Sequence, residues 1–407
     1  MAEAPKRRRP VWKILAVIAG VLIALVGSAA LWIRSAADRK FTAMEDRIRA
    51  LESEAHVAEK ARRAGTSPGD AWEDYLLALT EAGKLKEPEK LIGLFNGTLN
   101  GDQGFGEAAL AAHGSAIDDL LRGARRASST PPATFPDLRA WETVVLLAVL
   151  RARKLPPVEA IEIHLAVCQF AQDLEACGSW DSPGLGTGAL EKALEELQTP
   201  LQSPSFTMPA SADLEARLAL VEESLTRPER LRQGRLRLVG MMQTSVDFST
   251  AVQNTGAIRS LLCWRYGFSV RLMSARTFES WDHWLGRAQE ADRFAWPQAQ
   301  QEFKRLRQEI DHTVFEGHHQ DLTSPFLEDG SAGRTLRAHL RLLRAAVHYR
   351  RTGEVLELDD PFGTKLLHRE GGGRLRVWSV GIDGVDQHGK GNWDSRVIED
   401  IVLEVPR

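Results

Sequence analysis

The longest apolar stretch of the chain lies close to its N-terminus. Residues 11–33 are apolar apart from Lys13. As a helix, residues 14–33 would be about 30 Å long, which matches the hydrocarbon thickness of a bilayer. Trp12 and Trp32 lie near the two ends of this stretch, where interfacial tryptophans are found. The pattern therefore predicts a transmembrane helix over residues 11–33.

The residues before this stretch predict its orientation. Residues 1–10 form a basic tail that contains Lys6, Arg7, Arg8 and Arg9. Positive charges stay on the cytoplasmic side, so the tail is expected in the cytoplasm and the rest of the chain across the membrane. A cleaved signal peptide is the alternative, because small residues occupy positions 27–30. The length of the apolar run favours an uncleaved anchor.

Apolar residues recur at helical spacing over most of the remaining chain. Residues 34–64 read as a helical stalk that continues the membrane helix, and Ser67 and Pro68 as the cap and first turn of the next helix. Two helical regions are predicted, over residues 65–198 and 211–355. Between them, residues 199–210 contain three prolines and read as a linker. The candidate helices are 87–96, 106–126, 136–153, 156–177, 187–198, 211–225, 227–253, 256–274, 277–292, 296–316 and 332–353.

The pattern changes near the C-terminus, where residues 356–407 form a β-module. Residues 364–370 and 374–380 are two short runs joined by three glycines, which can supply the positive φ of a tight hairpin. Residues 400–405 read as a final strand. The predicted fold is therefore mainly α, with an N-terminal transmembrane helix, a multi-helix ectodomain and a small C-terminal antiparallel β-module.

The charge distribution and the cysteines limit the partners and the disulfides that the chain can have. The chain has a net charge of −3, and residues 1–40 carry +6, which leaves −9 for residues 41–407. A mildly acidic ectodomain argues against a nucleic-acid partner, which would need a basic face. Of the three cysteines, Cys168 and Cys177 are the closest in sequence and the more plausible disulfide pair in an oxidising compartment. The alternative is that Cys168, Cys177 and Cys263 are buried thiols.

The most specific motif lies in the β-module. It runs Asp360-Pro361-Phe362-Gly363, then Trp378-Ser379-Val380-Gly381-Ile382-Asp383-Gly384, and ends in Asp400-Ile401. These residues resemble the C-terminal β-region of the type II secretion major pseudopilins. The resemblance covers about 45 of the 407 residues. It implies a bacterial inner-membrane protein facing the periplasm, and a calcium-binding loop before the closing strand.

The resemblance does not extend to the pseudopilin N-terminus. There a glycine precedes Phe-Thr-x-x-Glu, which opens the apolar helix. Here residues 41–45 match the Phe-Thr-x-x-Glu pattern, but Lys40 stands in the place of the glycine. The apolar segment lies before these residues and not after them. The chain is therefore expected to share the terminal module and not the polymerising helix of that family.

The loop of the β-module contains the candidate metal ligands. Calcium takes six to eight hard oxygen ligands, and carboxylates suit it. The candidate ligands are Asp383, Asp386, Asp394 and Asp400. The alternative is a solvated turn in which aspartates serve turn geometry. Calcium is the one cofactor that the sequence suggests.

Other clusters are less specific. His312, Glu316, His318, His319 and Asp321 lie within ten residues but lack a His-Glu-x-x-His spacing. The tryptophans at 264, 281, 284 and 296 suit core filling or a ligand groove. No Gly-x-Ser-x-Gly or phosphate-loop motif is present, so the sequence does not indicate an enzyme.

The sequence favours a structural or interaction protein of the cell envelope, in a secretion- or pilus-related setting, with envelope proteins as partners. A membrane-tethered periplasmic enzyme and a ligand-binding receptor domain are the alternatives, since active sites and ligand pockets need not be contiguous in sequence.

Overall fold

The computed structural model describes most of the chain and divides it into two compact units. The described residues are 11–62, 67–95, 103–130, 140–177, 185–204, 206, 213–225, 279–280, 282–284, 286–288, 290–311, 330–393 and 399–407. One unit comprises residues 1–52 and 238–282, and the other residues 53–237 and 283–407. The helices predicted over 227–253 and 256–274 lie outside the described residues, and that over 277–292 lies partly outside.

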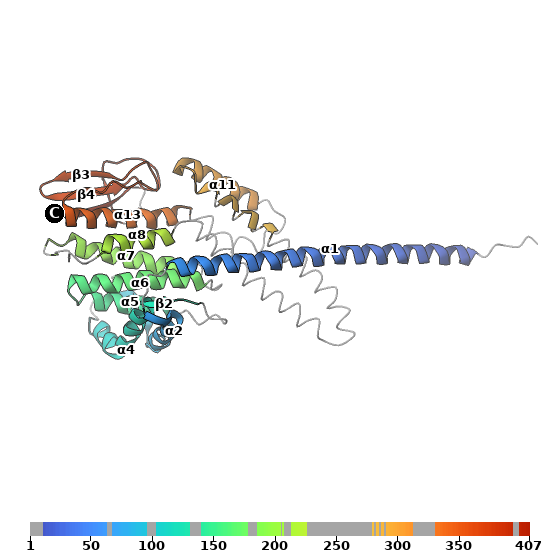
Figure 1. The fold of residues 1–407 in the computed structure, drawn as a ribbon, viewed down its shortest axis with the longest axis horizontal. Coiled ribbons are helices and arrows are strands. Elements are labelled where there is room, and N and C mark those ends of the chain that lie inside the picture. Colours follow the sequence, from blue (N-terminus) through green and yellow to red (C-terminus); the bar gives the residue numbers. More distant parts are fainter. Residues whose placement is uncertain are drawn as a thin grey trace, which may run out of the picture. The chain divides into compact units, whose positions relative to one another are not determined.

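The predicted apolar helix is confirmed as the first part of a longer helix, α1 (Val11–Arg62), which also includes nearly all of the predicted stalk (Figure 1). Its segment Leu15–Arg47 is long and apolar enough to cross a membrane. Apolar side chains in it are largely exposed, with Ile23 at 73% and Trp32 at 70%. Water would solvate this surface poorly, whereas lipid would solvate it well.

In the C-terminal part of this segment, residues 40–47 of α1 pack within their own unit. Phe41 and Met44, three residues apart and so on one helix face, are buried. Lys40 Nζ lies 2.7 Å from a Glu279 carboxylate oxygen, and Arg47 Nε lies 3.5 Å from one of Asp282. These contacts fix one face of the predicted stalk, which is therefore not a freely solvated helix.

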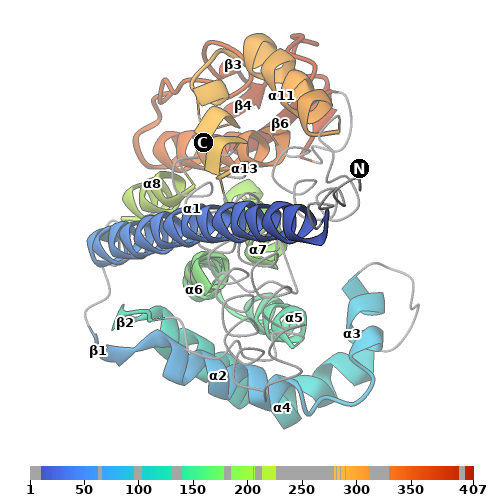
Figure 2. The same ribbon diagram turned by 90° about the vertical axis from the view of Figure 1, so that its right-hand side faces the viewer.

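The second unit is a stack of helices that share one hydrophobic core. In packing order, α2 contacts α4, α4 contacts α5 and α6, α6 contacts α7, and α7 and α8 contact α13 (Figures 1 and 2). The helices are α2 (Ala71–Ala82), α3 (Pro88–Phe95), α4 (Gln103–Ala124), α5 (Trp141–Ala152), α6 (Pro157–Cys177), α7 (Leu185–Gln202), α8 (Leu214–Ser224), α11 (Trp296–Asp311) and α13 (Gly330–Thr352).

The start of this unit differs in detail from the sequence prediction. Ser67 and Pro68 belong to strand β1 (Ser67–Asp70), which pairs in parallel with β2 (Arg126–Ser128). Helix α2 begins at residue 71, because the Asp70 side chain accepts a 2.9 Å hydrogen bond from Trp72 N. Asp70 is thus the N-cap.

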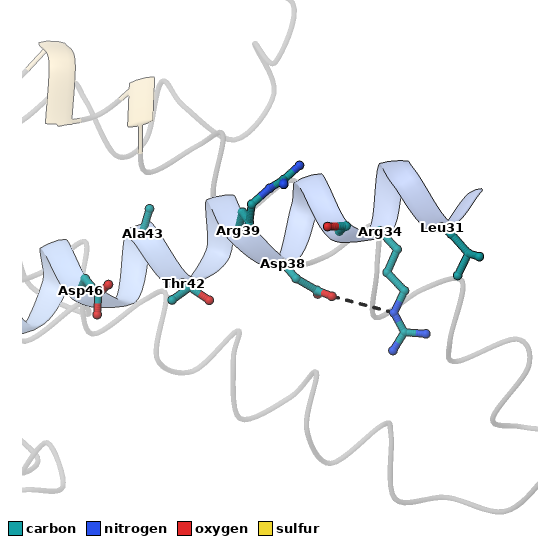
Figure 3. Close-up of a pocket in the computed structure, with 8 residues that line it drawn as sticks. Leu31, Arg34, Asp38, Arg39, Thr42, Ala43 and Asp46 are labelled. Carbon is teal, nitrogen blue, oxygen red and sulfur yellow. Dashed lines mark ion pairs between the residues drawn. The ribbon is translucent and has the colours of Figure 1, made fainter. Parts of the chain in front are cut away.

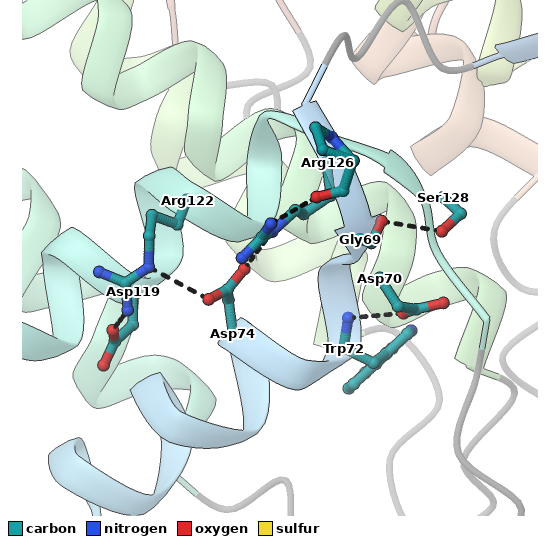
Figure 4. Close-up of polar contacts among 9 residues, drawn as sticks. Gly69, Asp70, Trp72, Asp74, Asp119, Arg122, Arg126 and Ser128 are labelled. Carbon is teal, nitrogen blue, oxygen red and sulfur yellow. Dashed lines mark hydrogen bonds and ion pairs between the residues drawn. The ribbon is translucent and has the colours of Figure 1, made fainter.

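A buried charge next to this cap ties α2 to α4 and β2. The Asp74 carboxylate accepts bonds from Arg122 Nε at 3.1 Å and from Arg126 Nε at 2.6 Å (Figure 4). Burial opposes ionisation of Asp74, but the two guanidinium groups lower its pKa overall. Both oxygens of the Asp74 carboxylate are bonded to a guanidinium group, so this cluster stabilises the packing of α2 against α4 and β2 and does not indicate a reactive site.

The predicted linker begins inside α7, which continues through Pro200. Leu201 and Phe206 are buried in the shared core. Arg350 of α13 donates hydrogen bonds to the carbonyl oxygens of Leu201 and Ser203 at 3.2 and 3.0 Å. The described part of this segment is therefore held against α13.

The C-terminal module is a four-stranded sheet in the order β3-β4-β6-β5. It comprises β3 (Leu367–Gly371), β4 (Arg374–Ser379), β5 (Gly391–Asn392) and β6 (Asp400–Pro406). The predicted hairpin is confirmed, with Gly372 and Gly373 at φ of 61° and 72°. The sheet is mixed and not purely antiparallel, because the short strand β5 runs parallel to β6. Strands β4 and β6 contact α13, so the helix carries the sheet.

Candidate functional site in the C-terminal module

Asp360 is the centre of a hydrogen-bonded turn in the C-terminal module. It is 4% exposed, and its carboxylate accepts hydrogen bonds from Phe362 N at 3.0 Å, Ser379 Oγ at 2.6 Å and Val380 N at 2.9 Å. Burial raises its pKa, while these three donors act in the opposite direction. The carboxylate thus joins the turn before β3 to the end of β4. In this chain the Asp-Pro-Phe-Gly and Ser-Val-Gly segments are therefore joined through one carboxylate.

Asp400, the first residue of β6, is a second buried carboxylate that accepts backbone hydrogen bonds. It is 1% exposed, and it accepts bonds from Gln387 N at 3.3 Å and Gly389 N at 2.7 Å. Burial raises its pKa, and the charges of Asp386 and Asp383 add to the increase. Asp400 therefore fixes the loop that precedes β5.

The other described aspartates of the loop, Asp383 and Asp386, also accept hydrogen bonds. Asp383 accepts bonds from Val385 N at 2.9 Å and Gln387 Nε2 at 2.7 Å. Asp386 accepts bonds from Trp378 Nε1 at 3.1 Å and His388 N at 2.7 Å. Burial opposes ionisation of Asp386, but the His388 N–H and the indole N–H lower its pKa overall.

The structure therefore brings Asp383, Asp386 and Asp400 into one loop, and Asp394 lies outside the described residues. Within the described chain, no group of three His, Cys, Asp or Glu side chains is arranged to hold a metal ion. The three carboxylates accept bonds from groups of their own loop, as the turn interpretation expects. Calcium binding by this loop stays a prediction.

A glycine in this loop allows a close backbone approach. Gly391 has φ of 155°, and a Cβ there would lie 1.9 Å from the Asp400 carbonyl oxygen. We expect Gly391→Ala to break the β5–β6 pairing and to destabilise the protein by about 1–3 kcal/mol. Thermal unfolding measures the loss. Gly371→Ala is the matched control, because nothing lies within 4 Å of its Cβ position. Equal shifts for both variants would contradict the expectation.

Of the other sequence candidates, Trp296 and Cys168 lie in the core, and Trp284 is half-buried. The histidine cluster at 312–321 and the tryptophans 264 and 281 lie outside the described residues. Trp296 is buried; its ring lies edge-to-face with Phe362 at 5.3 Å, and its Nε1 donates to the Ile382 carbonyl oxygen at 2.6 Å. It fastens α11 to the β-module. Cys168 is a buried free thiol, whose pKa burial raises to about 12.

Among the hollows on the described surface, two are relevant to the candidate residues. One has a volume of 630 Å³ and is lined by α1 residues from Leu31 to Asp46; the Arg34–Asp38 ion pair lies beside it (Figure 3). The other has a volume of 280 Å³ and lies next to β3, with Trp378, Leu366 and Leu367 among its lining residues. Asp360 and Asp400, the buried carboxyls with raised pKa, do not line either hollow.

A feature that the sequence analysis did not identify is a stripe of basic residues on α13. Three acidic residues each bind two of its members: Asp292 at 3.2 and 3.3 Å, Glu222 at 2.5 Å for both, and Glu215 at 3.1 and 2.8 Å. Through these ion pairs, α13 is held to α8, which contains Glu215 and Glu222, and to the turn at Asp292. The stripe's spacing of three and four was visible in the sequence, but its acidic partners are not adjacent to it. The stripe consists of Arg334, Arg337, Arg341, Arg344, His348 and Arg351.

Comparison of the chain with protein-family models, with curated proteins and with solved structures found no match to any of them.

Proposed function

We propose that this chain is a single-pass membrane protein that holds a helical ectodomain in the bacterial periplasm as a structural or interaction component of the cell envelope. The observation that carries the proposal is the exposed apolar surface of α1. Leu15, Leu22 and Ile23 are exposed by 60%, 55% and 73%. A lipid bilayer would solvate such a surface over the length of the segment.

Charge supports the orientation. Four basic residues precede the apolar segment at positions 6–9, and the ectodomain is mildly acidic. The N-terminus then lies in the cytoplasm, and the C-terminal module lies in the periplasm of an inner-membrane protein.

The C-terminal cassette supports the setting. Its resemblance to the major pseudopilins favours a secretion- or pilus-related assembly, by analogy at the level of the module. The buried carboxyls Asp360 and Asp400 favour an interaction role over catalysis, because backbone N–H groups already engage both of them. Envelope proteins are the proposed partners.

Membrane fractionation tests the anchor. We expect the full-length protein to stay in the membrane after an alkaline wash, and a phosphatase fused after Arg407 to be active only if that end lies in the periplasm. Leu22→Arg together with Ile23→Arg should release protein into the soluble fraction, because each central charge costs about 3 kcal/mol.

The matched control for this test is Leu77→Arg, the same change at an exposed leucine of α2. The control should leave the protein in the membrane. Wild-type protein in the wash fraction, or an inactive phosphatase fusion, would contradict the proposal. A mature chain that begins near residue 30 would show instead that the segment is a cleaved signal peptide.

A further inference from the structure

Strand β3 forms an edge of the sheet, and its outer side is open. Within the described chain β3 pairs only with β4. His368, Arg369 and Glu370 are exposed, and so is Gly371. An edge of this kind presents unpaired backbone N–H and C=O groups that can bind an additional strand.

The hairpin geometry identifies which groups are open. The two-residue turn makes Gly371 and Arg374 a hydrogen-bonded pair, so Arg369 and Leu367 also direct their backbone groups toward β4. The backbone groups of His368 and Glu370 therefore point away from β4. Leu366, the preceding residue of this alternating set, donates its N–H to the Leu358 carbonyl oxygen on the same outer side at 2.9 Å. The open edge thus begins directly after a segment that is already paired.

The sheet face beside this edge is basic. Arg369 lies opposite Arg376 in the register, and Arg374 is on the same face. Glu404 is the acidic residue among them, 2.8 Å from Arg374 and 3.8 Å from Arg376. The strand residues of this face thus carry three cations and one anion, and Asp386 of the adjoining loop, bonded to Trp378 Nε1, adds a second anion. The face keeps an excess of positive charge and complements an acidic strand.

A second copy of the chain fits this edge poorly. In the symmetric antiparallel register that uses the open groups, His368 lies opposite Glu370 of the other copy, but Arg369 lies opposite Arg369. Like charges directly opposite each other destabilise a strand pair. A register shifted toward the N-terminus would need the Leu366 N–H, which is already bonded.

The 280 Å³ hollow lies along the same edge, since Leu366, Leu367 and His368 are among its lining residues. The charged residues Glu357, Lys365 and Asp386 also line it. Trp378, which is 5% exposed, adds to its apolar part. In strand addition the backbone supplies affinity and a neighbouring pocket selects a side chain. Leu367 and Trp378 offer an apolar contact, beside these charged groups, to a side chain at the end of the added strand.

We propose that the open edge of β3 binds an extended acidic segment of a partner polypeptide by strand addition. A carboxylate of the segment lies opposite Arg369, and its backbone pairs with His368 and Glu370. The inference rests on the interaction role proposed above and names the surface and the chemistry of the partner.

A peptide titration tests this inference. The probe is a fluorescent peptide of alternating valine and glutamate, added to the full-length protein in detergent at low salt. Fluorescence anisotropy should show saturable binding. Arg369→Glu should weaken it about fivefold and should favour a peptide with lysine in place of glutamate. N-methylation of the valines that pair with His368 and Glu370 should abolish binding of the original peptide.

The matched control is Arg125→Glu, a charge reversal at an exposed arginine between α4 and β2. This variant should bind the glutamate peptide as the wild type does. Absence of saturable binding by the wild type, or binding that Arg369→Glu or N-methylation leaves unchanged, would overturn the inference. Because the titration uses purified protein, its failure would leave the result of membrane fractionation standing.

Discussion

Replacing Asp360 by alanine is expected to lower the free energy of unfolding by about 3–5 kcal/mol, because buried donors that lose their acceptor cost about 1–3 kcal/mol each. The variant would leave the N–H groups of Phe362 and Val380 and the hydroxyl of Ser379 without their acceptor. Chemical denaturation followed by circular dichroism measures the loss.

Asp359→Ala is the control for this prediction. Asp359 is adjacent and exposed, and Arg341 contacts its backbone carbonyl oxygen, which the substitution retains. We expect a change within about 0.5 kcal/mol. Similar losses for the two variants would show that the Asp360 carboxylate does not hold the module together.

Acidification is expected to destabilise the helical stack through His164. This side chain is 3% exposed, and burial, its largest influence, lowers the pKa to about 4 from 6.5. The unfolded chain therefore binds a proton between these two values while the folded chain does not. The stability is present above the unfolded pKa and is lost as the pH falls toward the folded pKa. The shift corresponds to about 3 kcal/mol.

The measurement is the free energy of unfolding of wild type and His164→Leu from pH 7 to pH 4. The difference between the two proteins should change by about 3 kcal/mol over that range, with the wild type losing more. His283→Leu, at an exposed histidine, is the matched control and should follow the wild type. A constant difference between wild type and His164→Leu would show that His164 is not buried in its neutral form.

Local pattern predicted the helices of the second unit well, because their apolar spacing and flanking prolines are properties of the sequence alone. The start of α2 was missed because Ser67 and Pro68 also suit a helix cap. The pairing of residues 67–70 with residues 126–128 decided the outcome. Such a pairing between distant segments carries no local signal.

The same limit applies to the candidate site. The sequence showed Asp383, Asp386 and Asp400 as oxygen donors, but it could not show that loop N–H groups engage Asp386 and Asp400. It also gave no role to Asp360 beyond the motif, since two partners of its carboxylate, at positions 379 and 380, lie at the end of β4 and not in the neighbouring sequence.

In-cell cross-linking of the full-length protein, followed by mass spectrometry, tests the central proposal most directly. The proposal predicts reproducible links from the ectodomain to secretion or pilus components of the envelope, with the links concentrated near β3. Links only between copies of the chain, or none at all, would contradict an assembly role and would direct attention to the hollow beside Trp378 and to small-molecule ligands.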